Sequence, residues 1–340
     1  MPPNLIFGAG SIGATANGFI YGFDTPAKVS ELLEALHRLN VRELDSAASY
    51  PVGNPGNTEV LLGQAGAVEE GFVIDSKVAA HIPAPTLDDK AIGASIDRTL
   101  TLLNTPKIRT LYVHAPDPKT PLEITAAAFH RQHLAGKFER LGLCNYKPTD
   151  VDRYFRICEE RGYVKPAVYQ GQYNALFRSA EKELIPLLRR NGCAFYAYSP
   201  LAGGFLTGKV TFAASGNGND GKNEKELDRT RWRGETTFAA YSRTYDTPAM
   251  HDAIRKLKAV CDATEQPMSL QEVALRWLVH HSALRQGDGI ILGAKRIEQL
   301  EGNVAGARKG PLEGDVLQAV EGLWATVRKN KEGKKKGGKL

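Results

Sequence analysis

The sequence contains few cysteines. Four occur among 340 residues, and no two of them form a CxxC pair: Cys144, Cys158, Cys193 and Cys261. Disulfide frameworks and zinc sites need cysteines at close or regular spacings, so neither is expected to support this fold. We interpret the four residues as buried small hydrophobic side chains in a reducing compartment.

Long apolar stretches are also missing. No stretch approaches the roughly 18 consecutive apolar residues that indicate a transmembrane helix. The first residues, MPPNLIFGAG, have neither the basic patch nor the apolar run of a secretory signal. We therefore expect no membrane association and a cytoplasmic location.

The net positive charge is confined to the end of the chain. The formal charge is +6, and residues 328–340 hold seven Lys or Arg and one Glu, which leaves the other 327 residues neutral. We predict a folded body at 1–327 and a disordered, basic tail at 328–340, because such a run cannot bury enough apolar surface to fold. Nucleic acid is therefore not an expected partner; an alternative in which the tail binds it predicts salt-sensitive binding.

Short apolar segments of β type alternate with segments of helical periodicity along the body. The eight predicted strands are Leu5 to Phe7, Arg42 to Leu44, Phe72 to Asp75, Ile108 to His114, Phe138 to Leu143, Val168 to Gln170, Ala194 to Tyr198 and Gly289 to Leu292. Parallel neighbours need a crossover, which is usually a helix. The pattern predicts an α/β fold, a (β/α)8 TIM barrel with a C-terminal helical extension; an open doubly wound sheet would show the same alternation.

Three of the predicted helices carry clear start signals. The N-cap candidates are Thr25, Thr86 and Ser269, and the last two have an acidic residue three positions later, the spacing of a capping box. In the helix after Ser269, Trp277 falls on the apolar face, so we interpret it as a core residue.

A glycine motif near the N-terminus imitates a dinucleotide-binding turn. Gly8, Gly10 and Gly13 have the GxGxxG spacing after a short apolar segment. In that turn a helix follows the third glycine directly, and its N-terminus faces the pyrophosphate. Here the following sequence is interrupted by Gly18 and Gly22. We therefore predict an ordinary turn.

Histidine spacing does not predict a metal site. His130 and His133 are three residues apart on a helical stretch, but Arg131 lies between them and no carboxylate is near. We expect them on a solvent-exposed face, and we expect no metal.

One segment, Thr211 to Asp246, breaks the alternation. Its first part is rich in Gly and Asn, and its second part is basic and aromatic. Long loops of this kind are disordered or functional.

Four polar residues stand where TIM-barrel enzymes place their chemistry, at the C-terminal ends of strands. Asp45 and Tyr50 follow the second predicted strand, Lys77 the third, and His114 ends the fourth. Each alone has an ordinary structural explanation: a turn cap, a solvated lysine or a core histidine. Together they form a candidate catalytic group.

These residues and their flanking motifs resemble the aldo-keto reductase superfamily. ELDSAASY, followed by NTE, resembles the segment that bears the catalytic aspartate and tyrosine of that family. SKV, YVHAPD, GKFERLGLCNY, VYQGQYNAL, FYAYSPLAGGFLTGK and ILGAKRIEQLEGN resemble its later landmarks, in the same order, from about residue 7 to residue 325. HAPD, YQGQYN, PLAGGFLTGK and RWLVHH are similar to the aflatoxin-aldehyde reductase (succinic semialdehyde reductase) branch.

The resemblance implies an enzyme that reduces aldehydes or ketones to alcohols with NADPH. Tyr50 would give a proton to the carbonyl oxygen, Lys77 would lie beside the phenol, and Asp45 would pair with Lys77. His114 would orient the carbonyl. The alternative is a nicotinamide-binding regulatory subunit with little turnover, because similar barrels serve as channel partners; the branch often forms homodimers.

The resemblance also implies a cofactor site. Asn145 and Gln170 would hold the nicotinamide carboxamide, and Tyr198 would stack on the ring. The family usually has a serine where Cys144 stands, and a thiol is a weaker donor. The other expected cofactor residues are Ser199, Pro200, Leu201, Gly203, Gly204 and Lys209 around the pyrophosphate, Arg231 in the long segment, and Lys295, Arg296, Gln299 and Asn303 at the adenosine end.

The expected substrate site joins Tyr241 and Arg243 of the long segment to Tyr50 and His114. An arginine over the pocket favours aldehydes that carry an acidic group, such as semialdehydes.

The proposed proton donor needs help from its neighbours. A free tyrosine has a pKa near ~10, and a fall of about 2 to 3 units requires roughly 3 to 4 kcal/mol of interaction. One desolvated ammonium at contact distance can supply this. Asp45 keeps Lys77 charged, because an unpaired buried ammonium loses its proton.

The basic pair after the last predicted strand favours the phosphorylated cofactor. Lys295 and Arg296 offer an ammonium and a guanidinium to a dianionic 2′-phosphate. As ordinary surface charges they would sit at a helix start, where the helix dipole slightly disfavours cations.

Overall fold

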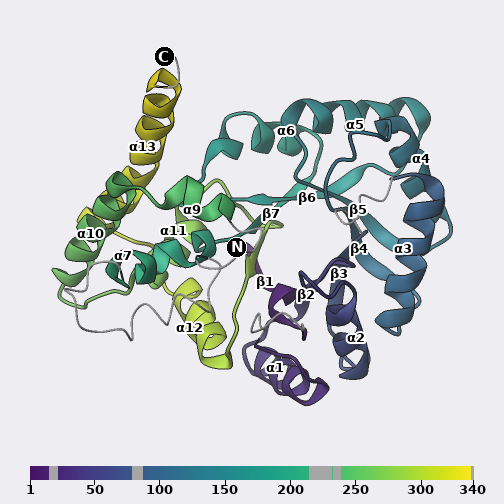
Figure 1. The fold of residues 1–340 in the computed structure, drawn as a ribbon, viewed down its shortest axis with the longest axis horizontal. Helices are drawn as coiled ribbons and strands as arrows, with labels where there is room; N and C mark the ends of the chain where they lie inside the picture. The colour runs from purple at the N-terminus through teal and green to yellow at the C-terminus, as the bar shows by residue number, and fades with distance from the viewer. Residues whose placement is uncertain (15–21, 79–86, 214–231, 233–238, 338–340) are drawn as a thin grey trace.

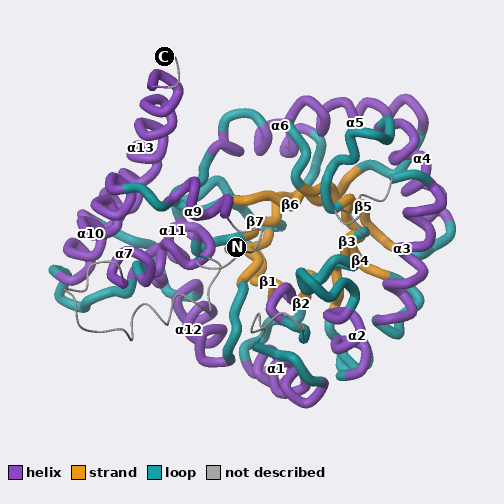
Figure 2. The backbone as a smooth tube through the Cα atoms, in the orientation of Figure 1, coloured by secondary structure: helices purple, strands orange, loops and turns teal. Residues whose placement is uncertain are grey.

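Short strands rich in Ile, Leu, Val and Tyr form a closed parallel barrel (Figures 1 and 2). The computed structural model describes residues 1–14, 22–78, 87–213, 232 and 239–337. Within these residues the eight strands are β1 (Asn4–Gly8), β2 (Glu43–Asp45), β3 (Val73–Lys77), β4 (Ile108–Val113), β5 (Phe138–Cys144), β6 (Pro166–Gln172), β7 (Ala194–Tyr198) and β8 (Gly289–Leu292). Each strand pairs with the next, and β8 pairs with β1, so the predicted (β/α)8 barrel is confirmed.

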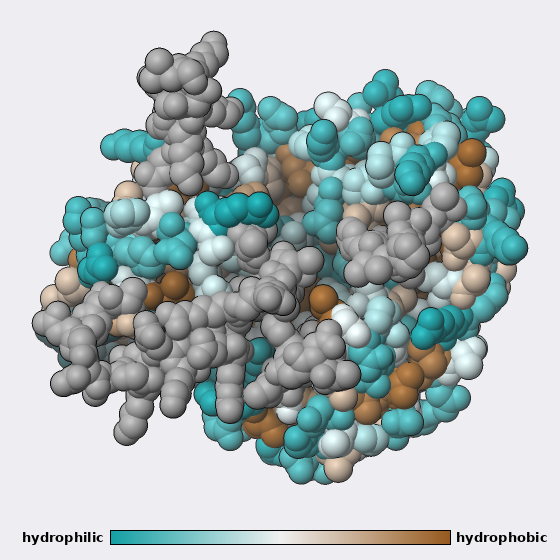
Figure 3. Space-filling model, viewed as in Figure 1, coloured by the Kyte–Doolittle hydropathy of each residue, from teal (hydrophilic) through white to brown (hydrophobic). Residues whose placement is uncertain are grey.

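Helices surround the barrel. Those that follow β1 to β6 in turn are α1 (Pro26–Arg38), α2 (Asn57–Gln64), α3 (Asp89–Leu102), α4 (Leu122–Leu134), α5 (Pro148–Arg161) and α6 (Leu184–Arg190). After β7 come α7 (Lys209–Ala213), α9 (Ala239–Tyr245), α10 (Pro248–Asp262) and α11 (Leu270–His280), and after β8 come α12 (Ile297–Ala307) and α13 (Gly314–Gly337). These later helices gather on one side of the barrel in Figure 1. The face shown in Figure 3 is mainly hydrophilic, with apolar residues in separate patches.

Two of the predicted helix starts are confirmed. The Thr25 side chain caps α1 by accepting a hydrogen bond from the backbone N of Lys28 at 3.3 Å. The Ser269 hydroxyl caps α11 in the same way, with the backbone N of Glu272 at 3.1 Å. The apolar stripes that follow these caps are buried.

The predicted start of α3 is wrong. The helix begins at Asp89, and its N-cap is Asp88, whose carboxylate accepts a hydrogen bond from the backbone N of Ala91 at 2.8 Å. Aspartate caps a helix at least as well as threonine, and Asp88 stands directly before the first helical residue. Thr86 itself lies outside the described residues.

The N-terminal glycines form a turn, as predicted. β1 ends at Gly8, and a short 3-10 helix, η1 (Ala9–Ser11), follows it. Gly13 has φ 141°, and a Cβ at this position would lie 2.4 Å from the ring of Pro51, so close packing requires the glycine. The next α-helix among the described residues begins at Pro26.

Side chains fill the interior of the barrel toward the starts of the strands. Arg109 donates to Asp75 at 2.8 and 2.7 Å and pairs with Glu43 at 2.7 Å. A separate small hydrophobic cluster consists of Ile6, Tyr112, Val168, Tyr196 and Ile291. This barrel is therefore a packed core rather than a channel.

The C-terminal helix α13 packs on α10 and α11. Its buried side chains recur at helical spacing: Val316, Val320, Leu323 and Val327. The guanidinium of Arg178 lies 4.9 Å from the centroid of the Trp277 ring and pairs with Glu321 of α13. The indole N–H of Trp277, a fully buried core residue as predicted, donates to Glu321 at 2.7 Å.

Helix α13 continues across residue 328, where the sequence predicts a disordered tail, and ends at Gly337. Lys and Glu are good helix formers, which gives a physical reason for this continuation. The last turns project from the body in Figure 1.

Replacing Glu321 by Ala should weaken the attachment of α13 to α11. The change leaves the indole N–H of Trp277 and the guanidinium of Arg178 without their shared acceptor, so we expect the free energy of unfolding to fall by about 1–3 kcal/mol. Urea denaturation followed by circular dichroism measures the loss. The exposed Glu313→Ala variant on the approach to α13 is the control, with an expected change within about 0.5 kcal/mol. Equal stability of the two variants would contradict the prediction.

Candidate active site

A cavity of about 600 Å³ opens at the C-terminal ends of the strands. Residues that follow β1, β2, β4, β5, β6, β7 and β8 line it, together with Trp232, Tyr241 and Gln271 from the later helices and the segment before them. A parallel barrel brings all these strand ends to one rim, so side chains far apart in the chain share one space.

A buried ion pair lies at the base of this cavity. The Nζ atom of Lys77, at the end of β3, is 2.8 and 2.7 Å from the two carboxylate oxygens of Asp45, at the end of β2. It also donates to the backbone O of Ser46 at 2.7 Å. Lys77 is 0% exposed and Asp45 is 4% exposed. The ammonium therefore has three acceptors, as a buried charge requires.

Electrostatics keep Lys77 protonated. Burial lowers the pKa of its ammonium, but attraction to Asp45 and Tyr50 outweighs this effect and holds the pKa above the ordinary lysine value. Burial raises the pKa of the Asp45 carboxyl, and the charge of Lys77 and a hydrogen bond from Gln170 at 2.7 Å oppose that rise. The close ion contact makes the charged pair the stable state at neutral pH.

Tyr50 lies next to this ion pair. The Nζ atom of Lys77 is 5.2 Å from the centroid of the Tyr50 ring. The backbone around Tyr50 is fixed on both sides, because its N–H donates to Ala47 at 2.9 Å and its O accepts from Gly56 at 2.9 Å. Gly10 lies against the ring, where an added Cβ would come within 3.6 Å of it. The phenol is thus held at the cavity.

His114 completes the predicted group. Its ring meets the Tyr50 ring edge to face, with 5.9 Å between centroids and an angle of 82°. The hydroxyl of Ser49 lies 3.3 Å from Nδ1, and the backbone O of His114 accepts a hydrogen bond from Asn145 at 3.0 Å. The structure therefore brings all four predicted catalytic residues together.

The next wall of the cavity carries amides and a phenol. Asn145 has φ 64°; its Nδ2 lies 3.1 Å from Sγ of Cys144, and its Oδ1 accepts from Tyr198 at 3.0 Å. Burial raises the pKa of the Cys144 thiol to about 12, so this sulfur stays protonated. Gln170 also lines the cavity. These groups offer fixed donors and acceptors to a planar ligand.

A turn of unusual backbone follows β7. Ser199 and Ala202 have φ near 55° and 52°, and Gly203 and Gly204 have φ 67° and 97°. A side chain holds each end of the turn. Asn174 donates to the O of Ser199 at 2.8 Å, and the indole N–H of Trp232 donates to the O of Gly203 at 2.8 Å. Turns of this kind can direct successive backbone N–H groups at an anion. Pro200 and Leu201 line the cavity within the same turn.

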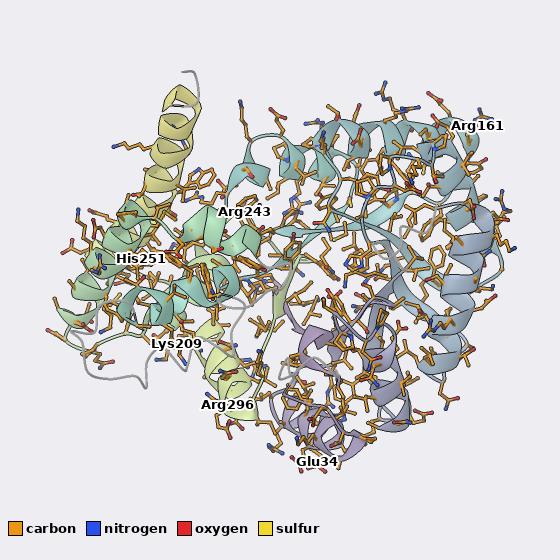
Figure 4. The ribbon with its side chains drawn as sticks, viewed as in Figure 1. Glu34, Arg161, Lys209, Arg243, His251 and Arg296 are labelled. Atoms are coloured by element: carbon orange, nitrogen blue, oxygen red, sulfur yellow. The ribbon has the colours of Figure 1, made fainter. Side chains whose placement is uncertain are left out.

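Cations dominate the rest of the lining. Lys209, Lys295 and Arg296 face the cavity, and Asp45, already paired, is the single carboxylate among the described residues that line it. Lys209 and Arg296 are labelled in Figure 4. The imbalance of charge favours an anionic ligand.

The start of α12 is held by amides. Gln299 accepts from the backbone N of Lys295 at 3.0 Å. Asn303, which is 4% exposed, accepts from Gln271 at 2.7 Å and donates to the O of Gly293 at 3.3 Å. All of the residues predicted for the adenosine end therefore share one part of the cavity.

One predicted residue of the described part of the chain is not brought into the cavity. Arg243 lies on α9, is exposed and is absent from the lining (Figure 4). Arg231 lies outside the described residues. Tyr241 does line the cavity and shares a short hydrogen bond with Ser199.

Sequence reasoning missed several residues of the site, and three of them show what signal was present or absent. Ser49 adjoins Tyr50 within the quoted motif, but its contact with His114 joins positions 65 residues apart. Trp232 lines the cavity and belongs to the second part of the long segment, whose basic and aromatic composition was the sequence signal for a functional residue. Gln271 follows a helix cap and carried no signal.

The histidines of α4 are half-buried and have structural partners, so the predicted face is exposed to solvent only in part. The ring of His130 stacks on Tyr163 at 4.8 Å between centroids, and its Nδ1 accepts from the backbone N of Val164 at 3.2 Å. The ring of His133 lies 5.4 Å from that of Phe138.

Other kinds of site find little support. Within the part of the chain that the structure describes, no three His, Cys, Asp or Glu residues gather as metal ligands do. No helix there combines the length and apolarity of a membrane span. The predicted burial of the cysteines is confirmed, and all four carry free thiols: Cys144, Cys158, Cys193 and Cys261.

Comparison with known proteins agrees with this geometry. The model of the aldo/keto reductase family matches residues 4–325. An aldo-keto reductase of Pseudocercospora fijiensis is 35% identical over 308 residues, which cover 88% of this chain and 98% of the relative. The human aflatoxin B1 aldehyde reductase member 2 is 36% identical over 89% of this chain and 83% of its own, and the oxidoreductase sirO of Leptosphaeria maculans is 31% identical over 96% and 95%. The predicted resemblance is confirmed, and the chain belongs to the aldo/keto reductase family of oxidoreductases.

Proposed function

We propose that the protein reduces aldehydes or ketones to alcohols with NADPH, and that Tyr50 protonates the carbonyl oxygen. The observation that carries the proposal is the position of Tyr50 at a cationic cavity, beside His114 and with its ring centroid 5.2 Å from Nζ of Lys77, which is paired with Asp45. A cytoplasmic location, expected from the sequence, and a homodimer, implied by the resemblance, belong to the same proposal.

The lining of the cavity fits a phosphorylated dinucleotide. Lys295 and Arg296 would hold the 2′-phosphate, with Gln299 and Asn303 near the adenine. The turn from residue 199 to residue 209 would hold the pyrophosphate through backbone N–H groups. When bound, NADPH supplies the hydride.

The nicotinamide would lie between Tyr198, Asn145 and Gln170. The ring of Tyr198 offers a flat apolar face, and the two amides offer donors and acceptors to the carboxamide. Asn145 and Gln170 are themselves fixed by hydrogen bonds to His114 and Asp45. Their positions are therefore set by the same residues that we assign to proton transfer.

The proton for the alcohol comes from Tyr50. The carbonyl oxygen gains negative charge when the substrate is reduced, and the phenol of Tyr50 would transfer its proton to that oxygen. The phenolate left behind lies next to the ammonium of Lys77, which stabilises it. Asp45 holds that ammonium in place and charged. His114 donates a hydrogen bond to the same oxygen and orients the carbonyl.

Turnover separates the enzyme from the regulatory alternative. Purified protein with NADPH and 4-nitrobenzaldehyde or succinic semialdehyde should lose the nicotinamide absorbance at a catalytic rate. Cofactor binding without turnover of a panel of aldehydes and ketones would support the regulatory subunit instead.

Tyr50→Phe should abolish reduction and leave NADPH binding near normal. The change removes the proton donor but keeps the ring, so kcat should fall by about 10²-fold or more. Steady-state rates and a fluorescence titration of NADPH measure the two effects. Tyr163→Phe, near the opposite end of the barrel, is the control. Retention of more than about a tenth of kcat would contradict the acid role.

Replacing Lys295 and Arg296 together by Ala should weaken NADPH far more than NADH. Charge-assisted hydrogen bonds to a phosphate are worth about 1.5–3 kcal/mol each, so the loss for NADPH should exceed tenfold. Titration with both cofactors gives the dissociation constants, and Arg308→Ala, at the other end of α12, is the control. Equal losses for the two cofactors would refute the phosphate assignment.

A further inference from the structure

We propose that His251 is a positioning residue for the dinucleotide. It joins α7, which carries Lys209, to the end of α9, which carries Tyr241, and so fixes two side chains that line the cavity beside the expected pyrophosphate site. The proposal rests on the proposed function for the identity of the ligand, and it deepens that function by a residue that does not itself line the cavity.

His251 lies behind the wall of the cavity. It belongs to the first turn of α10, its side chain is 13% exposed, and it is absent from the lining. Helix α10 packs against α7, and Figure 4 labels His251 and Lys209 on these two helices. The effect of His251 on a ligand is therefore indirect.

Both nitrogens of the His251 ring have partners from neighbouring segments. Nδ1 lies 3.0 Å from the hydroxyl of Thr211 on α7, and Nε2 lies 2.9 Å from a carboxylate oxygen of Asp246, the residue after α9. Because a carboxylate only accepts, Nε2 carries the proton of that hydrogen bond, while a hydroxyl can donate to Nδ1 or accept from it. The ring also lies against Phe205 of the 3-10 helix η3 (Ala202–Thr207), with 5.3 Å between centroids. One rigid ring therefore joins three parts of the structure.

The contact with Thr211 holds the helix that carries Lys209. Helix α7 has five residues, so it is too short to be stable by itself, and Lys209 is its first residue. Thr211 lies two positions later and is 0% exposed. The N–H of Phe212 donates to the O of Gly208 at 2.9 Å, which ties α7 to the turn after β7. His251 holds the same helix from the side of α10.

The contact with Asp246 holds the helix that carries Tyr241. The N–H of Asp246 donates to a backbone O in the last turn of α9 at 2.9 Å. Tyr241 and Tyr245 are four residues apart, so they share one face of α9, and their rings stack with 6.3 Å between centroids. The hydroxyl of Tyr241 shares a short hydrogen bond with Ser199, which begins the turn of positive φ. A path of direct contacts thus runs from His251 to that turn.

Phe205 links the ring of His251 to the middle of the turn. It is fully buried, and its ring stacks on Tyr245 of α9 with 5.9 Å between centroids. Its own helix, η3, contains Gly203 and Gly204, whose positive φ shapes the turn that we assign to pyrophosphate. His251 therefore packs against the turn itself and also holds the two helices beside it.

The position of His251 predicts which part of a ligand depends on it. The pyrophosphate is common to NADPH and NADH, whereas the 2′-phosphate occurs only in NADPH. An ammonium and a turn of backbone N–H groups bind an anion by its charge, so they treat the two pyrophosphates alike. Loss of His251 should therefore weaken both cofactors by the same factor, unlike loss of Lys295 and Arg296.

Hydrogen exchange of the unliganded full-length protein tests the link without cofactor or turnover. Exchange of backbone amides reports local opening, so weaker attachment of a short helix makes it faster. We expect faster exchange in His251→Ala over residues 241–246 and over residues 209–213, with unchanged exchange over α5. Unchanged exchange over either of the two segments overturns the proposal.

Fluorescence titrations test the effect on the dinucleotide. His251→Ala should raise the dissociation constants of NADPH and NADH by about tenfold each, the equivalent of one or two hydrogen bonds. The value of kcat at saturating NADPH should stay within about twofold of that of the parent protein, because binding rather than the chemical step is affected. His251→Gln, whose amide can still donate to Asp246, should recover most of the affinity.

The matched control is His133→Ala, which removes a half-buried histidine from α4 and should leave both dissociation constants unchanged. Unchanged affinities in His251→Ala, or a loss confined to NADPH, overturn the positioning role.

Asp246→Ala keeps the test decisive if His251→Ala does not fold. The Asp246 side chain is 55% exposed, so its removal leaves no buried cavity. The change breaks one of the two hydrogen bonds of the His251 ring, and the dissociation constants of both cofactors should rise by about threefold. No rise in either constant overturns the proposal.

The two proposals fail in different ways. A parent protein that binds neither NADPH nor NADH refutes the proposed function, and with it the role of His251 toward a dinucleotide. A parent enzyme that binds both cofactors and turns over aldehydes, and whose His251→Ala variant keeps both affinities, overturns the positioning role alone.

Discussion

The buried contact between Lys77 and Asp45 is the constraint on which the site depends. A charged group without solvent must find its partners inside the protein, and removal of one partner from such a pair typically costs about 3–5 kcal/mol. The acceptors of Lys77 come from the end of β2 and the residue after it, while Gln170 of β6 holds one of them from across the barrel. Pairing of β2 with β3 therefore satisfies this ammonium, and closure of the barrel adds Gln170, which holds Asp45 in place.

The parallel barrel explains why the chemistry gathers at one end. Toward the starts of the strands, Arg109 binds Glu43 and Asp75, and a small hydrophobic cluster packs as a separate unit. Toward the strand ends the interior is left open as a cavity. The loops at that end can thus carry polar residues and strained backbone, such as the positive φ of Asn145 and Ser199, because the packed strands beneath them supply the stability.

The barrel could be predicted from the sequence because the patterns that indicate its strands and helices are local. Strand and helix patterns recur over short windows, and Asp45, Lys77 and His114 stand at strand ends, where the topology brings them together. The failures involve choices that are local but ambiguous, such as Asp88 in place of Thr86 as a cap. They also involve contacts made only in three dimensions, such as those of His130 and Ser49. The two partners of such a contact lie far apart in the chain, so no short window of sequence contains both of them.

The assignments divide along the chain. The residues assigned to proton transfer follow β2, β3 and β4, whereas those assigned to the dinucleotide follow β5 to β8. Two amide hydrogen bonds, from Asn145 to His114 and from Gln170 to Asp45, join the sets. Substitutions after β5 to β8 can therefore change which dinucleotide is preferred, while Tyr50 and the other residues assigned to proton transfer stay the same. The condition is that Asn145 and Gln170 keep their two hydrogen bonds.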